Sequence, residues 1–326
     1  MANKNFQKAK INKNDEFYTQ LPDIENELKH YKDYFKDKVV YCNADDPRVS
    51  NFFHYFSYNF EYLGLKKLIT TCYKNQQIDL FSMHNQDSAI ALVYEGEKDK
   101  GRVPTIENIG VIELKGDGDF RSPEAIEFLK EADIVVTNPP FSLFRDYMAQ
   151  LIEYNKDFLI IGNFNSVTYK EVFPLIQNNK MWTGISPRSM NFETPEGEIK
   201  TVNAKWFTNL DIPKRHEEII LFKKYNEKDY PTYTNYNAIE VSKVSDIPVN
   251  YEGYMGVPIT FIESYNPEQF EIIGISLELA EPMTNHAKKG EFMQGGNRFY
   301  LKEKNGKYLY KRLYDRVVIK NKKVVE

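Results

Sequence analysis

Short apolar runs alternate with helix-like segments over the first 180 residues, and this alternation restricts the chain to few folds. Strands are predicted at residues 38–42, 67–72, 109–114, 133–137 and 158–162. Helices are predicted between several of them, at residues 23–37, 49–63, 122–131 and 142–154. This order predicts βαβ units, in which helices cover both faces of a largely parallel sheet. The first part of the chain is therefore expected to be an α/β domain.

The rhythm of the sequence changes after Met181. Further strands are predicted at residues 182–186, 202–207, 218–222, 270–276 and 316–320, and the loops between them are rich in Pro, Asn and Tyr. Residues 226–237, rich in Tyr and Asn, have the character of a linker. We therefore predict a first domain of residues 1–230 and a smaller C-terminal region of residues 231–326, some of whose elements begin near residue 180.

Composition excludes several classes of protein. With 326 residues, the chain is long enough to bury a core without disulfide or metal staples. Two Cys residues exclude a disulfide framework and fit a reducing cytoplasm. The Lys-rich residues 1–14 are not a secretory signal, and no apolar run approaches the ~20 residues that span a membrane. Cys-x-x-Cys and His-Glu-x-x-His motifs are absent, so we expect a cytoplasmic protein with neither a metal site nor a membrane partner.

Charge is distributed unevenly along the chain. Residues 287–326 contain 12 Lys or Arg and 4 Asp or Glu, a net charge of +8, while the rest of the chain carries −12. This asymmetry indicates either an anionic partner for the C-terminal region or a solvated basic tail. Aromatic residues of this region are expected mostly to pack a small β unit, namely Phe292, Phe299, Tyr300, Tyr308 and Tyr310.

The strongest chemical signal is the tetrapeptide Asn138-Pro139-Pro140-Phe141, which follows the predicted strand at residues 133–137. Open α/β sheets bind ligands beyond the carboxyl ends of their strands, and two prolines lock the backbone there. The Asn138 side-chain oxygen and the Pro139 carbonyl can accept both N–H bonds of a planar amino group, and Phe141 can stack on its ring. A Pro-rich strand exit with an Asn cap is the alternative.

With this tetrapeptide in place, the chain resembles the EcoRI-type adenine-specific DNA methyltransferase family, which uses S-adenosyl-L-methionine. Matching stretches lie at residues 15–19, 39–53, 116–120, 138–141, 206–211 and 270–274. The resemblance implies a Rossmann-like class I methyltransferase sheet with a smaller C-terminal target-recognition region. It also implies that Asn138, Pro139, Pro140 and Phe141 are catalytic residues in transfer of a methyl group to the N6 amine of adenine.

The resemblance also implies which residues hold the cofactor. Residues 15–19 match a motif whose aromatic and Thr side chains line the methionine end. A carboxylate after the first strand can pair with the ammonium group of the cofactor, although Asp45 or Asp46 can equally cap a helix. Asp117 corresponds to an acidic residue near the cofactor adenine, or to an ordinary turn residue. The expected cofactor residues are Phe17, Tyr18, Thr19, Asn43, Asp45, Asp46, Thr71, Asp117 and Asn138.

Two departures from the usual pattern affect the cofactor site. Residues 43–47, after the first strand, contain no Gly, so the backbone approach to the cofactor must differ. The second strand ends at Thr70-Thr71-Cys72 and lacks the acidic residue that usually binds the ribose hydroxyls. Thr71, or another residue, is expected to replace it through its hydroxyl group.

A target base inside a DNA duplex must flip out of the helix to reach such a pocket, at a cost of a few kcal/mol. The implied partner is therefore double-stranded DNA, bound by a monomer whose activity does not require a cognate restriction endonuclease. Arg, Asn and Gln side chains read guanine and adenine edges. The alternatives are an RNA or protein-amide N-methyltransferase, or a catalytically silent nucleic-acid-binding protein. Candidate base-reading residues are Arg188, Asn191, Arg215, Gln294, Asn297 and Arg298.

Overall fold

The structure, a computed structural model, describes residues 18–44, 50–72, 89–96, 109, 111–194, 197–303 and 306–324. Backbone contacts divide the chain into two units. The first unit comprises residues 1–166 and 183–210, and the second comprises residues 167–182 and 211–326.

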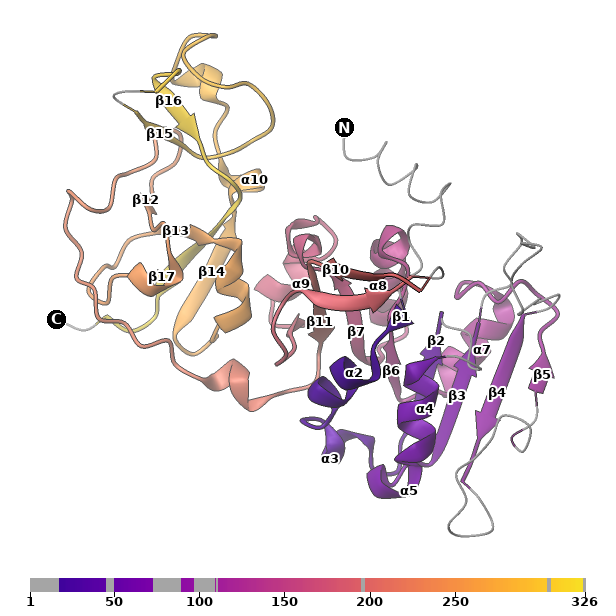
Figure 1. The fold of residues 1–326 in the computed structure, drawn as a ribbon. Helices are drawn as coiled ribbons and strands as arrows, with labels where there is room; N and C mark the ends of the chain where they lie inside the picture. Colours follow the sequence, from indigo (N-terminus) through magenta and orange to yellow (C-terminus); the bar gives the residue numbers. More distant parts are fainter. Residues whose placement is uncertain are drawn as a thin grey trace. The chain divides into compact units, whose positions relative to one another are not determined.

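An eight-stranded sheet has the strand order β5-β4-β3-β2-β6-β7-β11-β8 (Figure 1). Its centre is parallel and consists of β3 (Lys67–Thr71), β2 (Val39–Asn43), β6 (Ile134–Thr137) and β7 (Asp157–Asn163). Antiparallel pairing adds β4 (Ile90–Tyr94), β5 (Val111–Glu113) and β11 (Ala204–Thr208), and β8 (Trp182–Thr183) ends the order. The predicted α/β class is confirmed, but the sheet is mixed and is parallel only at its centre.

Burial explains why the sequence revealed the central strands. Every residue of β2 and β6 is buried, whereas all three residues of β5 are exposed. Parallel strands covered on both faces appear in a sequence as continuous apolar runs. The sequence also predicted strands that overlap β5, β8 and β11, but it missed β4 and the antiparallel pairing of the flanks.

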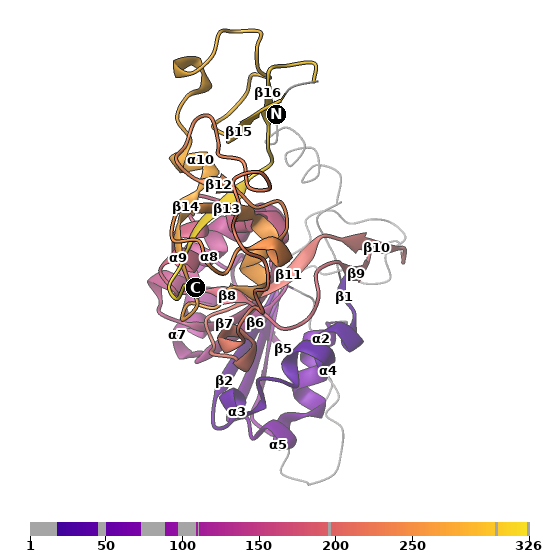
Figure 2. The same cartoon turned by 90° about the vertical axis from the view of Figure 1, so that its left-hand side faces the viewer.

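Helices lie on both faces of the sheet. In Figures 1 and 2, α4 (Asn51–Tyr58) lies on one face, while α7 (Pro123–Glu131) and α8 (Phe144–Glu153) lie on the other. The predicted start of α7 is confirmed, because the Ser122 hydroxyl accepts a hydrogen bond from the Ala125 backbone N at 3.2 Å and Pro123 occupies the first turn. The short α5 (Phe60–Leu63) ends, as predicted, at Gly64 with φ 65°.

The helix predicted at residues 23–37 is divided in two, α2 (Leu21–Leu28) and α3 (Lys32–Phe35). The chain departs from helical geometry at Tyr31, which has φ −117° and ψ 13°. The apolar residues that suggested one helix, Ile24, Leu28, Tyr31 and Phe35, are all fully buried. The apolar spacing therefore continues across the break, and periodicity alone could not reveal it.

A separate three-stranded sheet has the order β1-β9-β10, with β1 (Tyr18–Thr19), β9 (Met190–Glu193) and β10 (Ile199–Val202). Both pairings are antiparallel. This sheet brings the N-terminal end of the described chain next to residues 192–193. The short segments η1 (Phe141–Leu143) and η2 (Phe164–Thr168) follow β6 and β7, and α9 (Phe173–Gln177) belongs to the second unit.

The second unit contains a four-stranded sheet in the order β12-β13-β17-β14. β13 (Met255–Pro258) and β14 (Phe270–Ile275) pair antiparallel to β17 (Arg316–Asn321), and β12 (Ile239–Glu240) is parallel to β13. The strands predicted at residues 270–276 and 316–320 are thus confirmed. Smaller elements are η3 (Pro213–His216), η4 (Val244–Asp246), η5 (Ile259–Ser264), α10 (Ser276–Leu279), η6 (Met283–Asn285), β15 (Tyr300–Lys302) and β16 (Tyr310–Arg312).

The prediction of a strand at residues 218–222 is wrong. The Gln269 side chain holds this segment by two hydrogen bonds of 2.8 Å with the backbone of Ile219, so a side chain takes the place of a partner strand. Ile220 and Phe222 are 85% and 68% exposed. The apolar run therefore reflects exposed side chains rather than a buried strand face.

Aromatic packing builds the core of the second unit, as the sequence predicted. The Phe299 ring stacks on Tyr233, with centroids 4.4 Å apart, and on Tyr236, with centroids 5.0 Å apart. Phe292 and Tyr300 are also buried.

Across the described ranges, no helix is long and apolar enough to span a membrane.

Candidate active site

The tetrapeptide of residues 138–141 leaves the centre of the large sheet, where β6 lies between β2 and β7. Asn138 is 7% exposed, Pro139 is buried and Pro140 is half-buried. The Pro140 carbonyl accepts a hydrogen bond from the Leu143 backbone N at 2.9 Å, so the chain turns at once into η1 and then α8. Because neither proline has an N–H group, the ladder cannot continue past Asn138.

Phe141 and the N-terminal motif meet through β9. In the β1–β9 pair, Thr19 lies opposite Phe192. The Phe192 ring packs against the Phe141 ring, with centroids 6.3 Å apart and planes at 85°. Phe192 is fully buried, whereas Phe141 is partly exposed. Two motifs that the sequence placed far apart therefore share one neighbour.

Thr19 is fixed in place through its backbone, but its hydroxyl makes no hydrogen bond with the described residues. The Thr19 carbonyl accepts a hydrogen bond from Asn51 Nδ2 at 2.8 Å. The residue is 2% exposed, and within the described part of the chain its Oγ1 makes no hydrogen bond. Burying a hydroxyl without a partner is unfavourable. The arrangement suits a polar ligand at this edge, which would supply the missing partner.

Asn43 ties together the strand ends at the carboxyl edge of the sheet. Its carbonyl oxygen accepts a hydrogen bond from the Thr137 hydroxyl, and its Oδ1 accepts one from the Tyr147 hydroxyl. A further hydrogen bond joins its side chain to Tyr41. Asn43 therefore links β2 to β6 and α8, and it fixes the residue that immediately precedes Asn138.

Tyr41 and Tyr147 supply hydroxyl groups to this edge rather than charges. Burial raises the pKa of Tyr41 to about 12, against hydrogen bonds from Thr71 and Asn43 that lower it. Burial also raises the pKa of Tyr147 well above its ordinary value. Both phenols remain protonated at neutral pH. The Tyr41 hydroxyl lies 2.8 Å from Thr71 Oγ1, so the Thr71 hydroxyl already takes part in a hydrogen bond.

Asp117 lies in a turn that crosses the end of β3. Its carboxylate accepts a hydrogen bond from the Asp119 backbone N at 3.0 Å. Gly118 has φ 77°, and a Cβ at this position would lie 2.1 Å from the carbonyl oxygen of Cys72, the residue after β3. Only glycine permits this approach. The turn holds the exposed carboxylate of Asp117 near the strand that carries Thr71.

The structure thus brings most of the predicted site residues to one edge of the first unit. Asn43 lies opposite Thr71 in the β2–β3 register. Asn138 follows Thr137, which is bonded to Asn43, and Asp117 lies in the Gly118 turn. Thr19, in β1, connects to Phe141 through Phe192. Three predicted cofactor residues lie outside the described residues: Phe17, Asp45 and Asp46.

Sequence reasoning missed several residues that support this edge. Phe192 was missed although apolar and polar residues alternate in Met190–Glu193, which is the sequence signal of a strand with one covered face. Glu27 was missed as well. It is fully buried and accepts hydrogen bonds from the backbone N atoms of Ile185 and Ser186 at 2.8 and 2.6 Å, which fixes the chain ahead of β9. A Glu inside the apolar stripe of a predicted helix was the available signal.

Several candidate base-reading residues are engaged within the protein. Arg188 lies over the Phe164 ring, and Asn191 Oδ1 accepts a hydrogen bond from Thr201 at 2.7 Å. Arg215 lies 3.8 Å from the Trp182 ring centre and donates to Asn179 at 2.9 Å, so its guanidinium is already held. By contrast, Gln294 and Asn297 are exposed.

Among the residues that the structure describes, no three His, Cys, Asp or Glu side chains are grouped to hold a metal ion. The site therefore consists of an amide, two prolines, an aromatic ring and hydroxyl groups at the end of a central parallel strand. This set can orient a planar amino group and polarise it through acceptor oxygens.

The chain belongs to the EcoRI family of adenine-specific methyltransferases, because the model of the family "Adenine-specific methyltransferase EcoRI" matches residues 5–322. It is therefore a methyltransferase.

Among the proteins it is similar to, the Type II methyltransferase M.EcoRI of Escherichia coli is 51% identical in an alignment that covers 83% of this chain and 89% of that protein. The Type II methyltransferase M.MgeORF184P of Mycoplasma genitalium is 38% identical over 98% of this chain and 99% of that protein. The Type II methyltransferase M.MpnI of Mycoplasma pneumoniae is 38% identical over 82% of this chain and 84% of that protein. No solved structure matches the chain significantly.

Proposed function

We propose that this methyltransferase transfers a methyl group from S-adenosyl-L-methionine to the N6 amine of a flipped adenine within a specific duplex DNA sequence. The observation that carries the proposal is Asn138, nearly buried at the carboxyl end of the central strand β6, with Phe141 three residues further on. The central strands act in this proposal as a Rossmann-like class I sheet. The second unit, with its basic C-terminal residues, is proposed to bind and recognise the DNA.

The residues at this edge fit the proposed cofactor. The buried Thr19 hydroxyl makes no hydrogen bond within the described residues, so a bound polar group would satisfy it. The exposed Asp117 carboxylate lies in the turn that Gly118 holds against the end of β3. Thr71 and Asn43, and Tyr18 next to Thr19 in β1, complete the proposed set. Hydrogen bonds to Tyr41 and Tyr147 already engage Thr71 and Asn43. When bound, S-adenosyl-L-methionine supplies an electrophilic methyl group.

The tetrapeptide prepares the adenine amine for attack. The Asn138 side-chain oxygen and the Pro139 carbonyl would each accept one N–H bond of the amine, which withdraws its lone pair from conjugation with the ring. The Phe141 ring would stack on the flipped base, a contact worth roughly 1–3 kcal/mol. The nitrogen loses its proton after methyl transfer, when it has become acidic, so the mechanism does not need a strong base.

The direct test is to incubate the protein with labelled S-adenosyl-L-methionine and mixed-sequence duplex DNA and then to digest the DNA to nucleosides. Label in N6-methyladenine is the expected result. RNA and protein acceptors are tested in parallel. Label that entered only these acceptors would overturn the DNA assignment, and the absence of cofactor binding would favour a catalytically silent DNA-binding protein.

Asn138→Ala tests the assigned role of the tetrapeptide. Loss of one preorganised electrostatic contact is expected to lower the transfer rate by about 100- to 1,000-fold while cofactor binding, measured by calorimetry, stays unchanged. Asn138→Asp is the matched variant, because it keeps an acceptor oxygen at the same place, and it should retain more activity. Wild-type turnover by Asn138→Ala would exclude the role.

A further inference from the structure

Within the second unit, Tyr314 precedes β17 and its side chain is 90% exposed. We propose that Tyr314 is a DNA-contacting residue whose aromatic ring packs against the bases of the bound duplex. The inference rests on the proposed function, because it names the residue through which the second unit engages the DNA substrate.

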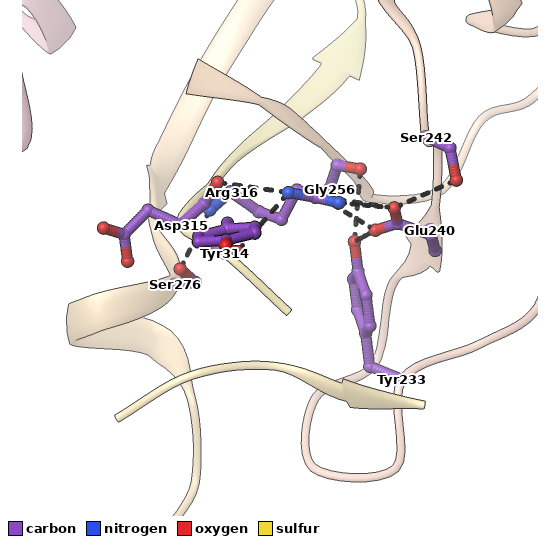
Figure 3. Close-up of polar contacts among 8 residues, drawn as sticks. All are labelled: Tyr233, Glu240, Ser242, Gly256, Ser276, Tyr314, Asp315 and Arg316. Atoms are coloured by element: carbon purple, nitrogen blue, oxygen red, sulfur yellow. Dashed lines mark hydrogen bonds and ion pairs between the residues drawn. The ribbon is translucent and has the colours of Figure 1, made fainter. Parts of the chain in front are cut away.

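The backbone that carries Tyr314 is braced from inside the unit. Arg316 Nη1 donates to the carbonyl oxygens of Tyr314 and Asp315, each at 3.4 Å (Figure 3). The Arg316 backbone N also donates to the Ser276 hydroxyl at 3.0 Å. On its other side, the Arg316 guanidinium donates to both carboxylate oxygens of Glu240, at 2.8 and 3.0 Å.

Glu240 is itself held in the core of the unit. It is 4% exposed and accepts further hydrogen bonds from the hydroxyls of Tyr233 and Ser242 (Figure 3). A buried ion pair adds little stability over well-packed apolar residues of similar volume. What this pair provides is position, because it fixes the guanidinium that holds the two carbonyl groups beside Tyr314.

A second loop, residues 294–298, contacts residues 312–315 beside Tyr314, and the two segments form one surface. Arg298 Nε lies 2.8 Å from Asp315 Oδ1. Arg312 Nη1 donates to the Gly295 carbonyl at 3.0 Å. The two guanidinium groups are thus used to tie the loops together, and they leave the exposed amides of Gln294 and Asn297 and the ring of Tyr314 facing solvent. A hollow of about 200 Å³ lies beside the 294–298 loop.

Charge and chemistry identify the occupant of this surface. Residues 287–326, which include both loops, carry a net charge of +8, so a polyanion is attracted to it. Single exposed aromatic residues are common, but amide groups and an aromatic ring held on a braced loop, within a stretch of the chain that has a net positive charge, match the groups that contact nucleic-acid bases. The occupant is therefore duplex DNA.

Tyr314→Ala tests the inference. DNA binding is measured by the fluorescence anisotropy of a labelled, unmethylated duplex that contains the sequence in which the enzyme methylates adenine. Loss of the ring should weaken DNA binding by about 5-fold, the low end of the range for an aromatic ring on unpaired bases, because the stacked bases of a duplex expose only their edges. Tyr314→Phe should bind within about twofold of wild type, because it keeps the aromatic face. The slope of log Kd against log salt should not change in either variant, because no phosphate contact is lost.

Tyr62→Ala is the matched control, since Tyr62 is an exposed tyrosine in α5 of the first unit, and its DNA affinity should equal that of wild type. Equal DNA affinity of Tyr314→Ala and wild type would overturn the inference. So would a change of oligomeric state with unchanged DNA affinity, which would make the surface an interface between copies. Failure of the proposed function would show differently, as a wild-type protein that binds DNA but transfers no methyl group to it.

Discussion

At the scale of single residues, the catalytic proposal depends on which polar side-chain atoms already make a hydrogen bond within the protein. Asn43 and Thr71 were expected to contact the cofactor, yet hydrogen bonds to Tyr147 and Tyr41 already engage their side chains. Thr19 is the opposite case, because its hydroxyl is buried and makes no hydrogen bond within the described residues. A sequence identifies such residues by type and position, but it cannot show which hydroxyl already has a partner.

Thr19→Val should therefore separate ligand binding from stability. The change replaces a hydroxyl by a methyl group of similar size, and no hydrogen bond among the described residues is lost. The urea midpoint of unfolding should not fall, while the Kd for S-adenosyl-L-methionine should rise about 3- to 10-fold, as expected for one neutral hydrogen bond. Thr19→Ser should restore the affinity. A Thr19→Val variant that bound the cofactor like wild type would remove Thr19 from the proposed site.

At the scale of elements, the sequence predicted the buried strands and the helix ends best. β2, β6 and β7 were identified because continuous apolar runs mark strands covered on both faces, and Ser122 and Gly64 marked helix ends by their own chemistry. The site was only partly predictable. Its tetrapeptide is a local motif, whereas the contact of Phe192 with Phe141 depends on how β9 pairs with β1, which no local pattern encodes.

The turn at Gly118 gives a prediction at this scale. Gly118→Ala should displace the turn that carries Asp117, because its φ of 77° is unfavourable for Ala and the new Cβ would meet the Cys72 carbonyl oxygen at 2.1 Å. We expect weaker cofactor binding and a lower urea midpoint. Gly197→Ala is the matched control, since Gly197 has a similar φ of 80° but none of the described residues beyond its chain neighbours lies within 4 Å of the added Cβ. If both variants lost the same amount of binding, backbone strain rather than the position of the turn would be responsible.

At the scale of the whole molecule, the chain does not divide into two continuous ranges. Residues 167–182 belong to the second unit, although strands of the first unit lie before and after them in sequence. A change of sequence rhythm can suggest one boundary, but it cannot show that the chain leaves a unit and returns to it. That each unit has its own function, one binding the cofactor and the other recognising the target, stays a prediction.

Unfolding of the second unit should depend on pH through His216. Hydrogen bonds of its imidazole to Asp211, at 2.9 Å, and to Glu268, at 3.0 Å, raise the pKa of His216 above its ordinary value of 6.5. Arg215 also lies 3.8 Å from Asp211 and competes for its charge. A raised pKa in the folded state stabilises the protein fully below pH 6.5, and this stabilisation is lost as the pH rises through the folded-state pKa.

The urea midpoint of wild type should therefore fall, relative to that of His216→Gln, as the pH is raised from 6 to 8.5. The effect should be small and should shrink at high salt, because the pairs are exposed. A midpoint difference between the two proteins that stayed constant with pH would show that His216 contributes no charge to stability.

The pairing of β1 with β9 has a consequence for how the enzyme is made. Thr19 and Phe141 share Phe192 as a neighbour, and Phe192 lies in a strand that follows the tetrapeptide in the chain. The ribosome must therefore translate past residue 192 before that neighbour exists. A nascent or truncated polypeptide that stops earlier carries the entire tetrapeptide but lacks the residue that Thr19 and Phe141 share as a neighbour.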